Sequence, residues 1–240
     1  MRVRLSHYDL TVALTLLLLA MLQLQPAGPA REPMSFGASG PATVYVVLGD
    51  STAAGSGAPY DAGIAVQTAR HLGVARRITM HNFGVSGARM RDVLERQLPQ
   101  AEALRPDLVL ISAAANDVTH LTSIPSMRRR LRETVRRLRA ANPRVRIVVT
   151  GSPDMGSPPR IPWILRGTAS LRTKMVNRMF KSETKTLNLV FAPIAERTGP
   201  LFRRDRLLFD ADRFHPNARG YATWIAVLND ALARAMNSSR

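Results

Sequence analysis

Ser51 has the surroundings that a nucleophilic serine needs. It follows the β-branched run 43–48, and the small residues of 52–57 come directly after it. A serine on a tight turn between a strand and a helix exposes its hydroxyl beside a backbone N–H, so such a turn can hold a nucleophile and half of an oxyanion hole. Taken alone, the segment could equally be a phosphate-binding turn or a plain Ser/Gly loop, although the phosphate-loop pattern with its lysine is absent.

A candidate base stands near the carboxyl end. Asp212 precedes His215 by three positions. On one turn the Asp212 carboxylate could hold the Nδ1 proton of His215 while Nε2 faces the serine, so Asp212 would orient the imidazole and stabilise its charged form. A surface turn or a metal site could contain the same pair. No second histidine or carboxylate has helical metal-ligand spacing to His215, so we expect neither a metal nor another cofactor.

Four segments, each at the end of an expected strand or in the following loop, carry a family resemblance. They are Gly49-Asp50-Ser51, Asn82-Phe83-Gly84-Val85-Ser86-Gly87, Ala114-Ala115-Asn116-Asp117 and Asp212-x-x-His215. In this order they resemble the four conserved blocks of the SGNH (GDSL-type) hydrolase family. The resemblance covers about residues 43–235.

This resemblance implies an esterase or lipase-like enzyme that cleaves carboxylic esters through an acyl-serine intermediate. Ser51 would be the nucleophile, His215 the general base and Asp212 the residue that orients it. The oxyanion hole would consist of the backbone N–H groups of Ser51 and Gly87 and the side-chain amide of Asn116. Family members also act as thioesterases and glycan O-acetylesterases, and the sequence leaves these alternatives open.

Two further features bear on the substrate. The third block usually opens with glycine where this chain has Ala114, so that loop is expected to lie tighter against the acyl group. The segment around Pro153-Asp154-Met155-Gly156 resembles a loop of an esterase and lysophospholipase-like branch of the family. Met155, Trp163 and Ile164 are therefore candidate substrate-binding residues, and an ordinary capping loop is the alternative.

The elements that must position these residues alternate regularly beyond residue 42. We expect strands at 43–48, 78–82, 107–112, 145–150 and 188–192, and helices near 61–72, 89–104, 126–141, 168–186 and 217–235. Nearly continuous apolar runs are typical of parallel strands covered on both faces. The order predicts one α/β domain over 43–236 with a doubly wound parallel sheet, and the resemblance implies the same three-layer, flavodoxin-like sandwich. Active sites in such sheets lie beyond the carboxyl ends of the strands.

The helix expected over 126–141 is unusually rich in arginine. Met127, Leu131, Val135 and Leu138 have the spacing of one buried face, and seven arginines fill much of the remainder. Ser126 could cap its start, and Asn142-Pro143 would end it. The arginines form either a solvated outer face or a patch for an anionic membrane or wall surface. A non-catalytic binder of anionic lipid or wall polymer is accordingly the rival function; we expect no nucleic-acid partner.

The first thirty residues indicate export. Arg2 and Arg4 precede an apolar run over about 10–24, and small residues and prolines follow. This is the layout of a signal peptide cleaved after Ala30, and an uncleaved membrane anchor is the alternative. Either would place the domain in the periplasm, at the cell wall or outside the cell. The Gly-, Pro- and Ser-rich segment 31–42 is expected to be a linker.

Overall fold

The computed structural model describes residues 31–237, so the expected signal or anchor at 1–30 lies outside the described residues. Six strands form one sheet in the order β1-β3-β2-β4-β5-β6, and all neighbours are parallel except β1 with β3. The strands are β1 Met34–Phe36, β2 Ala42–Gly49, β3 Arg77–Asn82, β4 Leu108–Ser112, β5 Arg146–Val149 and β6 Val190–Phe191. The predicted doubly wound sheet with five parallel strands is confirmed.

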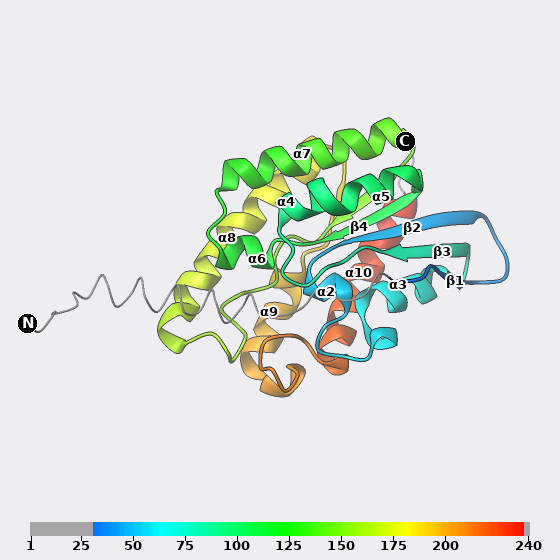
Figure 1. The fold of residues 1–240 in the computed structure, drawn as a ribbon. Helices are drawn as coiled ribbons and strands as arrows, with labels where there is room; N and C mark the ends of the chain where they lie inside the picture. Colours follow the sequence, from blue (N-terminus) through cyan, green and yellow to red (C-terminus); the bar gives the residue numbers. More distant parts are fainter. Residues whose placement is uncertain (1–30, 238–240) are drawn as a thin grey trace, which may run out of the picture.

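Helices cover both faces of this sheet (Figure 1). On one face lie α3 Ile64–Leu72, α9 Ile194–Arg204 and α10 Ala218–Asn237; on the other lie α4 Met90–Asp92, the π-helical η2 Val93–Gln97, α5 Leu98–Ala103, α7 Ile124–Ala141 and α8 Trp163–Thr186. Shorter turns are α2 Ser51–Ala54, η1 Tyr60–Ala62, α6 Ala115–Thr119 and η3 Arg206–Leu208. No helix within residues 31–237 is long and apolar enough to cross a membrane.

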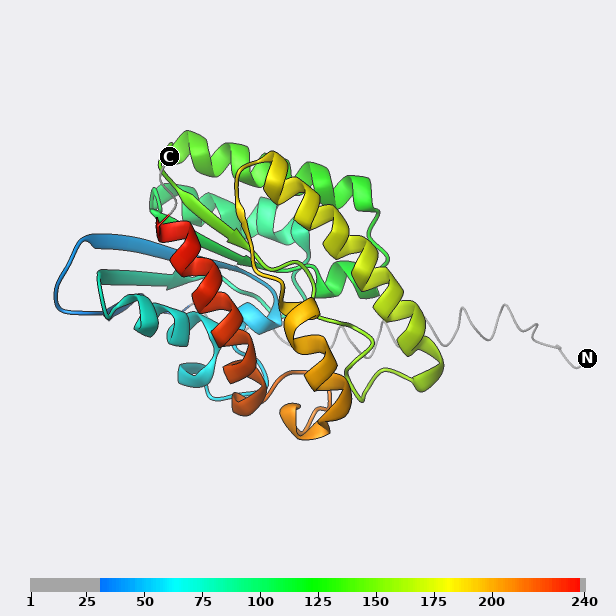
Figure 2. The same cartoon turned by 180° about the vertical axis from the view of Figure 1, so that it is seen from behind.

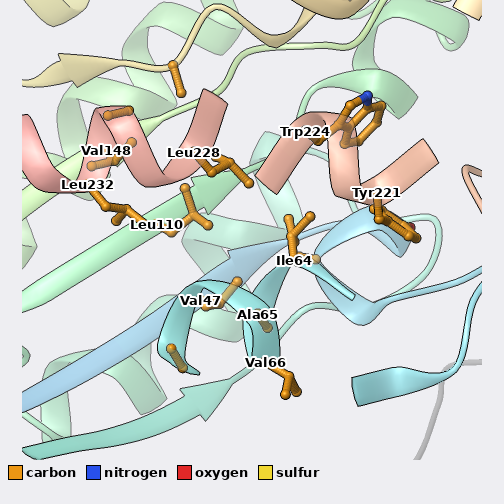
Figure 3. Close-up of a cluster of buried hydrophobic side chains, with 14 of the residues drawn as sticks. Val47, Ile64, Ala65, Val66, Leu110, Val148, Tyr221, Trp224, Leu228 and Leu232 are labelled. Carbon is orange, nitrogen blue, oxygen red and sulfur yellow. The ribbon is translucent and has the colours of Figure 1, made fainter. Parts of the chain in front are cut away.

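The sheet separates two hydrophobic cores, and β2 contributes side chains to both. Tyr45 and Val47 pack in the core that holds α3 and α10, whereas Val46 and Leu48 pack in the core of α5 and α7. Figure 3 shows the first of these cores, where side chains from three neighbouring strands meet those of α3 and α10. Because successive strand residues point to opposite faces and both faces are covered, the strand is apolar throughout.

The structure corrects the linker expected over 31–42, because part of this segment belongs to the sheet. Residues Met34–Phe36 form β1, which pairs antiparallel with β3, and Phe36 packs against the core. The guanidinium carbon of Arg31 also lies 3.9 Å from the centroid of the Tyr60 ring. A three-residue strand is too short to show an alternating pattern, and the Gly- and Pro-rich turn after it dominates the composition. The folded domain therefore begins before residue 43.

Two predicted helix starts also need correction. Helix α7 begins at Ile124: its N-cap residue is Ser123 and not Ser126, the Ser123 side chain makes no capping hydrogen bond, and a proline occupies the first turn. Its end at Asn142 is as predicted. Helix α8 begins at Trp163 and not near 168, directly after Pro162. In both cases a proline lies at the helix start, where its missing N–H leaves no hydrogen bond unmade.

Candidate active site

The turn that carries Ser51 is fixed by its neighbours on both sides. Gly49 ends β2 with φ +151°, and a Cβ there would lie 1.8 Å from the carbonyl oxygen of Ser112, so only glycine fits. Asp50 is the N-cap of α2: its Oδ1 accepts hydrogen bonds from the Thr52 N–H at 2.9 Å and the Thr52 hydroxyl at 2.8 Å. Burial raises the pKa of Asp50 to about 6, although the Thr52 bonds lower it. Ser51 is then the first residue of the helix and is 8% exposed.

Gln97, at the end of η2 on the face of the sheet that carries α5 and α7, also holds the turn before Ser51. Its side-chain Nε2 donates to the Gly49 carbonyl at 2.8 Å, and its Oε1 accepts from the Gly49 N–H at 2.8 Å. One buried amide thus satisfies both backbone polar groups of the last β2 residue, as a neighbouring strand would. Sequence reasoning did not identify Gln97, because the π-helical segment η2 that it ends interrupts the regular helical spacing.

The imidazole of His215 lies between Ser51 and Asp212. Its Nε2 is 2.9 Å from the Ser51 hydroxyl oxygen, and its Nδ1 is 2.5 Å from Oδ2 of Asp212. Burial raises the pKa of Asp212, but hydrogen bonds from His215 and Phe214 outweigh it and lower the pKa to about 2. An ionised carboxylate can only accept hydrogen bonds, so Nδ1 carries the proton and Nε2 of the neutral ring can accept from the serine hydroxyl.

The two loops that carry Ser51 and His215 are packed tightly together. Gly57, just after α2, has φ +91°, and a Cβ there would lie 2.6 Å from Cβ of His215 and 2.5 Å from the carbonyl oxygen of Pro216. The hydroxyl of Tyr221 in α10 donates to the carbonyl of Ser56 at 2.6 Å. These contacts fix the height of the imidazole over the serine turn.

Asn116 and Gly87 lie at the same edge of the sheet, in the segments that follow β4 and β3. Asn116 stands in α6 after β4, and its side-chain Nδ2 donates to the Ala88 carbonyl at 3.1 Å. Gly87 lies in the exposed turn after β3 with φ +80°. The Ser51 N–H is the first of helix α2, a position without an intrahelical partner. The structure therefore brings the three expected oxyanion donors to one rim of the sheet.

The backbone conformation at Ala114 explains why the family usually has glycine at this position. It is the N-cap of α6 and has φ +99°, in the left-handed region that L-residues avoid. The loop that Ala114 opens is therefore strained, and its tighter approach to the acyl group stays a prediction.

A small apolar cavity of about 30 Å³ borders Ser51 and His215. Its walls include Pro153, Met155, Pro158, Phe202, Phe214 and Trp224. Of the three expected substrate-binding residues, Met155 lines it, whereas Trp163 and Ile164 do not and are exposed at the start of α8. Phe202 was missed because α9 was not predicted; Phe214 could have been found from its place between Asp212 and His215.

A second, polar cleft of about 320 Å³ meets the first at Asn116. Gly87, Arg89, Arg96 and His120 line this cleft, and Asp92 is the acidic residue among its lining residues. No three His, Asp or Glu side chains of residues 31–237 are grouped as metal ligands.

Ion pairs account for much of the arginine-rich helix α7. Arg128 and Arg132 both pair with the buried Glu183 of α8, and Arg137 pairs with Glu102 of α5. These pairs tie α7 to its two neighbours, a role that neither sequence interpretation of the arginines included.

Residues 47–223 match the family model of the GDSL-like Lipase/Acylhydrolase family. The chain belongs to this family. Among curated relatives of the GDSL-like family, the GDSL-like esterase Rv1075c of Mycobacterium tuberculosis is 34% identical over 201 residues, which are 80% of this chain. The chain spans 62% of the length of that relative.

Several solved structures share the fold. TesA superposes with a TM-score of 0.66 at 18% identity, over 80% of this chain and 99% of its own. The psychrotrophic esterase EstA from Pseudoalteromonas sp., solved as a complex inhibited by monoethylphosphonate, superposes with a TM-score of 0.63 at 20% identity, over 82% of this chain and 100% of its own. At such identities the likeness extends to the fold alone.

Proposed function

We propose that this GDSL-like protein is a serine esterase that cleaves carboxylic esters through an acyl-Ser51 intermediate. The observation that carries the proposal is the continuous hydrogen-bonded row from the Ser51 hydroxyl through His215 to Asp212. A nucleophile within reach of a base, and a base fixed by a carboxylate, are the groups that acyl transfer requires.

In the proposed reaction, Nε2 of His215 takes the Ser51 proton as Oγ attacks the ester carbonyl carbon. The resulting oxyanion accepts hydrogen bonds from the N–H groups of Ser51 and Gly87 and from the Asn116 amide. When the intermediate collapses, the C–O bond to the alcohol breaks and His215 gives its proton to the departing oxygen. A water, deprotonated by His215, then attacks the acyl-serine, which releases the acid and restores Ser51. Asp212 stays ionised throughout.

The two cavities favour a particular kind of ester. The apolar cavity of about 30 Å³ beside Ser51 has room for only a few heavy atoms, which suits a short acyl group. The polar cleft of about 320 Å³ suits a larger, hydrophilic alcohol portion. This combination makes O-acetylated glycans the second candidate substrate; thioesters remain a third.

Hydrolysis of p-nitrophenyl esters of increasing acyl length tests the proposal. We expect kcat/KM to be highest for acetate or propionate and to fall with longer chains. Ser51→Ala should lower turnover on the order of 10⁴-fold or more and abolish labelling by a fluorophosphonate probe. Full activity in folded Ser51→Ala would refute the assignment, and a rate that rises with chain length would refute the short acyl site.

We propose further that the enzyme acts outside the cytoplasm, on the basis of residues 1–30. Amino-terminal sequencing of the protein from cell fractions tests this. A soluble extracytoplasmic chain that begins near Arg31 supports cleavage, whereas a full-length membrane-bound chain supports an anchor. Recovery from the cytoplasm would refute both.

A further inference from the structure

The exposed side of α8 begins with a group of large apolar side chains. Trp163 is 81% exposed, Ile164 58%, Leu171 60% and Met175 44%. Ile164, Leu171 and Met175 are separated by seven and four residues, a spacing that places them on one side of a helix. Figure 2 shows α8 on the near side of the molecule, where no other described element covers it. Single exposed apolar residues are common on protein surfaces, but a group on one helix face marks an interaction site.

The same side of α8 continues as a row of cations. Lys174, Arg178, Lys181 and Lys185 are all exposed. The acidic residue of the helix, Glu183, is instead buried and paired with arginines of α7. The exposed side of α8 therefore presents positive charge without a compensating carboxylate of its own.

Two carboxylates from other segments lie near these cations. Glu196 of α9 and Asp154 border a cleft of about 410 Å³ together with Lys174, Arg178 and Lys181. Asp154 is already paired with Arg203 of α9. Glu196 can thus offset one of the charges, and a net positive surface remains.

Exposed tryptophan and aliphatic residues next to unpaired lysines and arginines are the combination that binds the interface of an anionic bilayer. A second copy of this chain fits less well, because its own α8 would bring the same cations and no exposed carboxylate of that helix to pair with them. The net charge of +17 acts in the same direction, since it repels another copy and attracts anionic lipid.

We propose that the exposed side of α8 docks on an anionic lipid surface. Trp163, Ile164 and Leu171 enter the headgroup region, and Lys174, Arg178 and Lys181 contact lipid phosphates. The segment that leads into α8 also contributes Met155 and Pro158 to the apolar cavity beside Ser51, so the docking surface is continuous in the chain with a wall of that cavity. This surface is distinct from the arginine-rich helix α7 that the sequence suggested for the same partner.

Tryptophan fluorescence of the full-length protein tests the docking. The chain has two tryptophans, and Trp224 is only 4% exposed, so a change on membrane binding reports Trp163. With vesicles of phosphatidylcholine and phosphatidylglycerol, we expect a blue shift and quenching by brominated acyl chains. Neither should occur with phosphatidylcholine alone, nor in the Trp163→Phe variant. Vesicle binding that leaves Trp163 unquenched, as attachment through residues 1–30 alone would give, overturns the proposal.

A pair of charge variants tests the cations. Lys174→Glu/Arg178→Glu/Lys181→Glu should reduce the Trp163 quenching at a given anionic lipid concentration at least about tenfold, since each cation near the surface contributes a several-fold factor. Arg70→Glu/Arg144→Glu/Arg204→Glu is the matched control, because these three arginines are also exposed and the charge change is identical. Equal losses in both variants would mean that only net charge matters and would refute a specific face. Self-association without vesicles that disappears in Trp163→Phe would assign the face to a second copy.

Discussion

The two halves of the candidate site are held in different ways. On the Ser51 and His215 side, each polar group is buried or tied by short hydrogen bonds: Gln97 and Asp50 fix the turn, and Asp212 fixes the ring. On the opposite side Gly87 lies in an exposed turn, and the Asn116 amide donates to a carbonyl of that same turn.

This difference indicates which half of the candidate site has its proposed working geometry before substrate binds. The Ser51 hydroxyl oxygen and Nε2 of His215 already have the separation that proton transfer requires, and the ionised Asp212 favours the tautomer with the proton on Nδ1. Asn116 must redirect or share its hydrogen bond to Ala88 before it can serve an oxyanion. We therefore expect variants of the first half to abolish turnover and variants of the second to weaken it.

Asp212→Asn should have the largest effect. Its Oδ1 can still accept from the backbone N–H groups of Phe214 and His215, but an amide then faces Nδ1 and favours the wrong tautomer of the ring. We expect kcat to fall on the order of 10⁴-fold with the fold retained. Steady-state kinetics with a thermal melt measures this. A loss below tenfold would mean that Asp212 does not set the tautomer.

Asn116→Ala should have a smaller effect, mainly on kcat. It removes a hydrogen bond to the substrate oxygen that is stronger in the transition state than in the ground state. The loss of such a bond typically lowers kcat on the order of 10²–10³-fold. Asn116→Asp should be at least as harmful, because a carboxylate repels the forming oxyanion. The measurement is kcat and KM of both variants on one short ester. A change confined to KM in a folded protein would give Asn116 only a structural role, that of tying α6 to the turn at Ala88.

Gln97→Met tests whether the support beneath the serine turn matters. It keeps the volume but leaves the buried Gly49 N–H without an acceptor, at about 1–3 kcal/mol in stability, whereas the Gly49 carbonyl still accepts from the Val85 N–H at 3.1 Å. We expect kcat to fall about tenfold through a displaced Ser51, with KM nearly unchanged. Gln100→Met, on the exposed side of α5, is the control and should change neither. Lower stability with full kcat would show that Gln97 supports the fold and not the nucleophile.

Ala114→Gly should have the smallest effect. Glycine removes about 1–2 kcal/mol of left-handed strain, and its greater freedom in the unfolded chain offsets about 0.5–1 kcal/mol of that gain. We expect a slightly higher melting temperature and kcat within about twofold of the parent. A clear loss of activity would instead mean that the methyl group of Ala114 positions the Asn116 loop.

The sequence predicted what depends on strand ends and missed what depends on tertiary contact. Buried parallel strands are apolar throughout, so their ends could be located, and with them Ser51 and Asn116. Gln97 could not be found, because its partner is a backbone group 48 residues away and no side-chain pattern encodes that contact. Trp163 and Ile164 were expected at the substrate because they follow the segment that resembles a loop of an esterase branch of the family; the structure leaves them on the surface. Helix α9, which supplies Phe202, contains Pro200 and so resembled a loop.

The short strand β1 has a consequence for how much of this chain behaves as an independent unit. It pairs with β3, so without it β3 would be an edge strand with a row of open N–H and C=O groups, which recruits strands from other molecules. A protein shortened to the boundary that the sequence suggests, residue 43, would therefore be prone to aggregation, although every candidate catalytic residue is retained. Removal of residues 1–30 alone, as signal cleavage would do, leaves this protection in place.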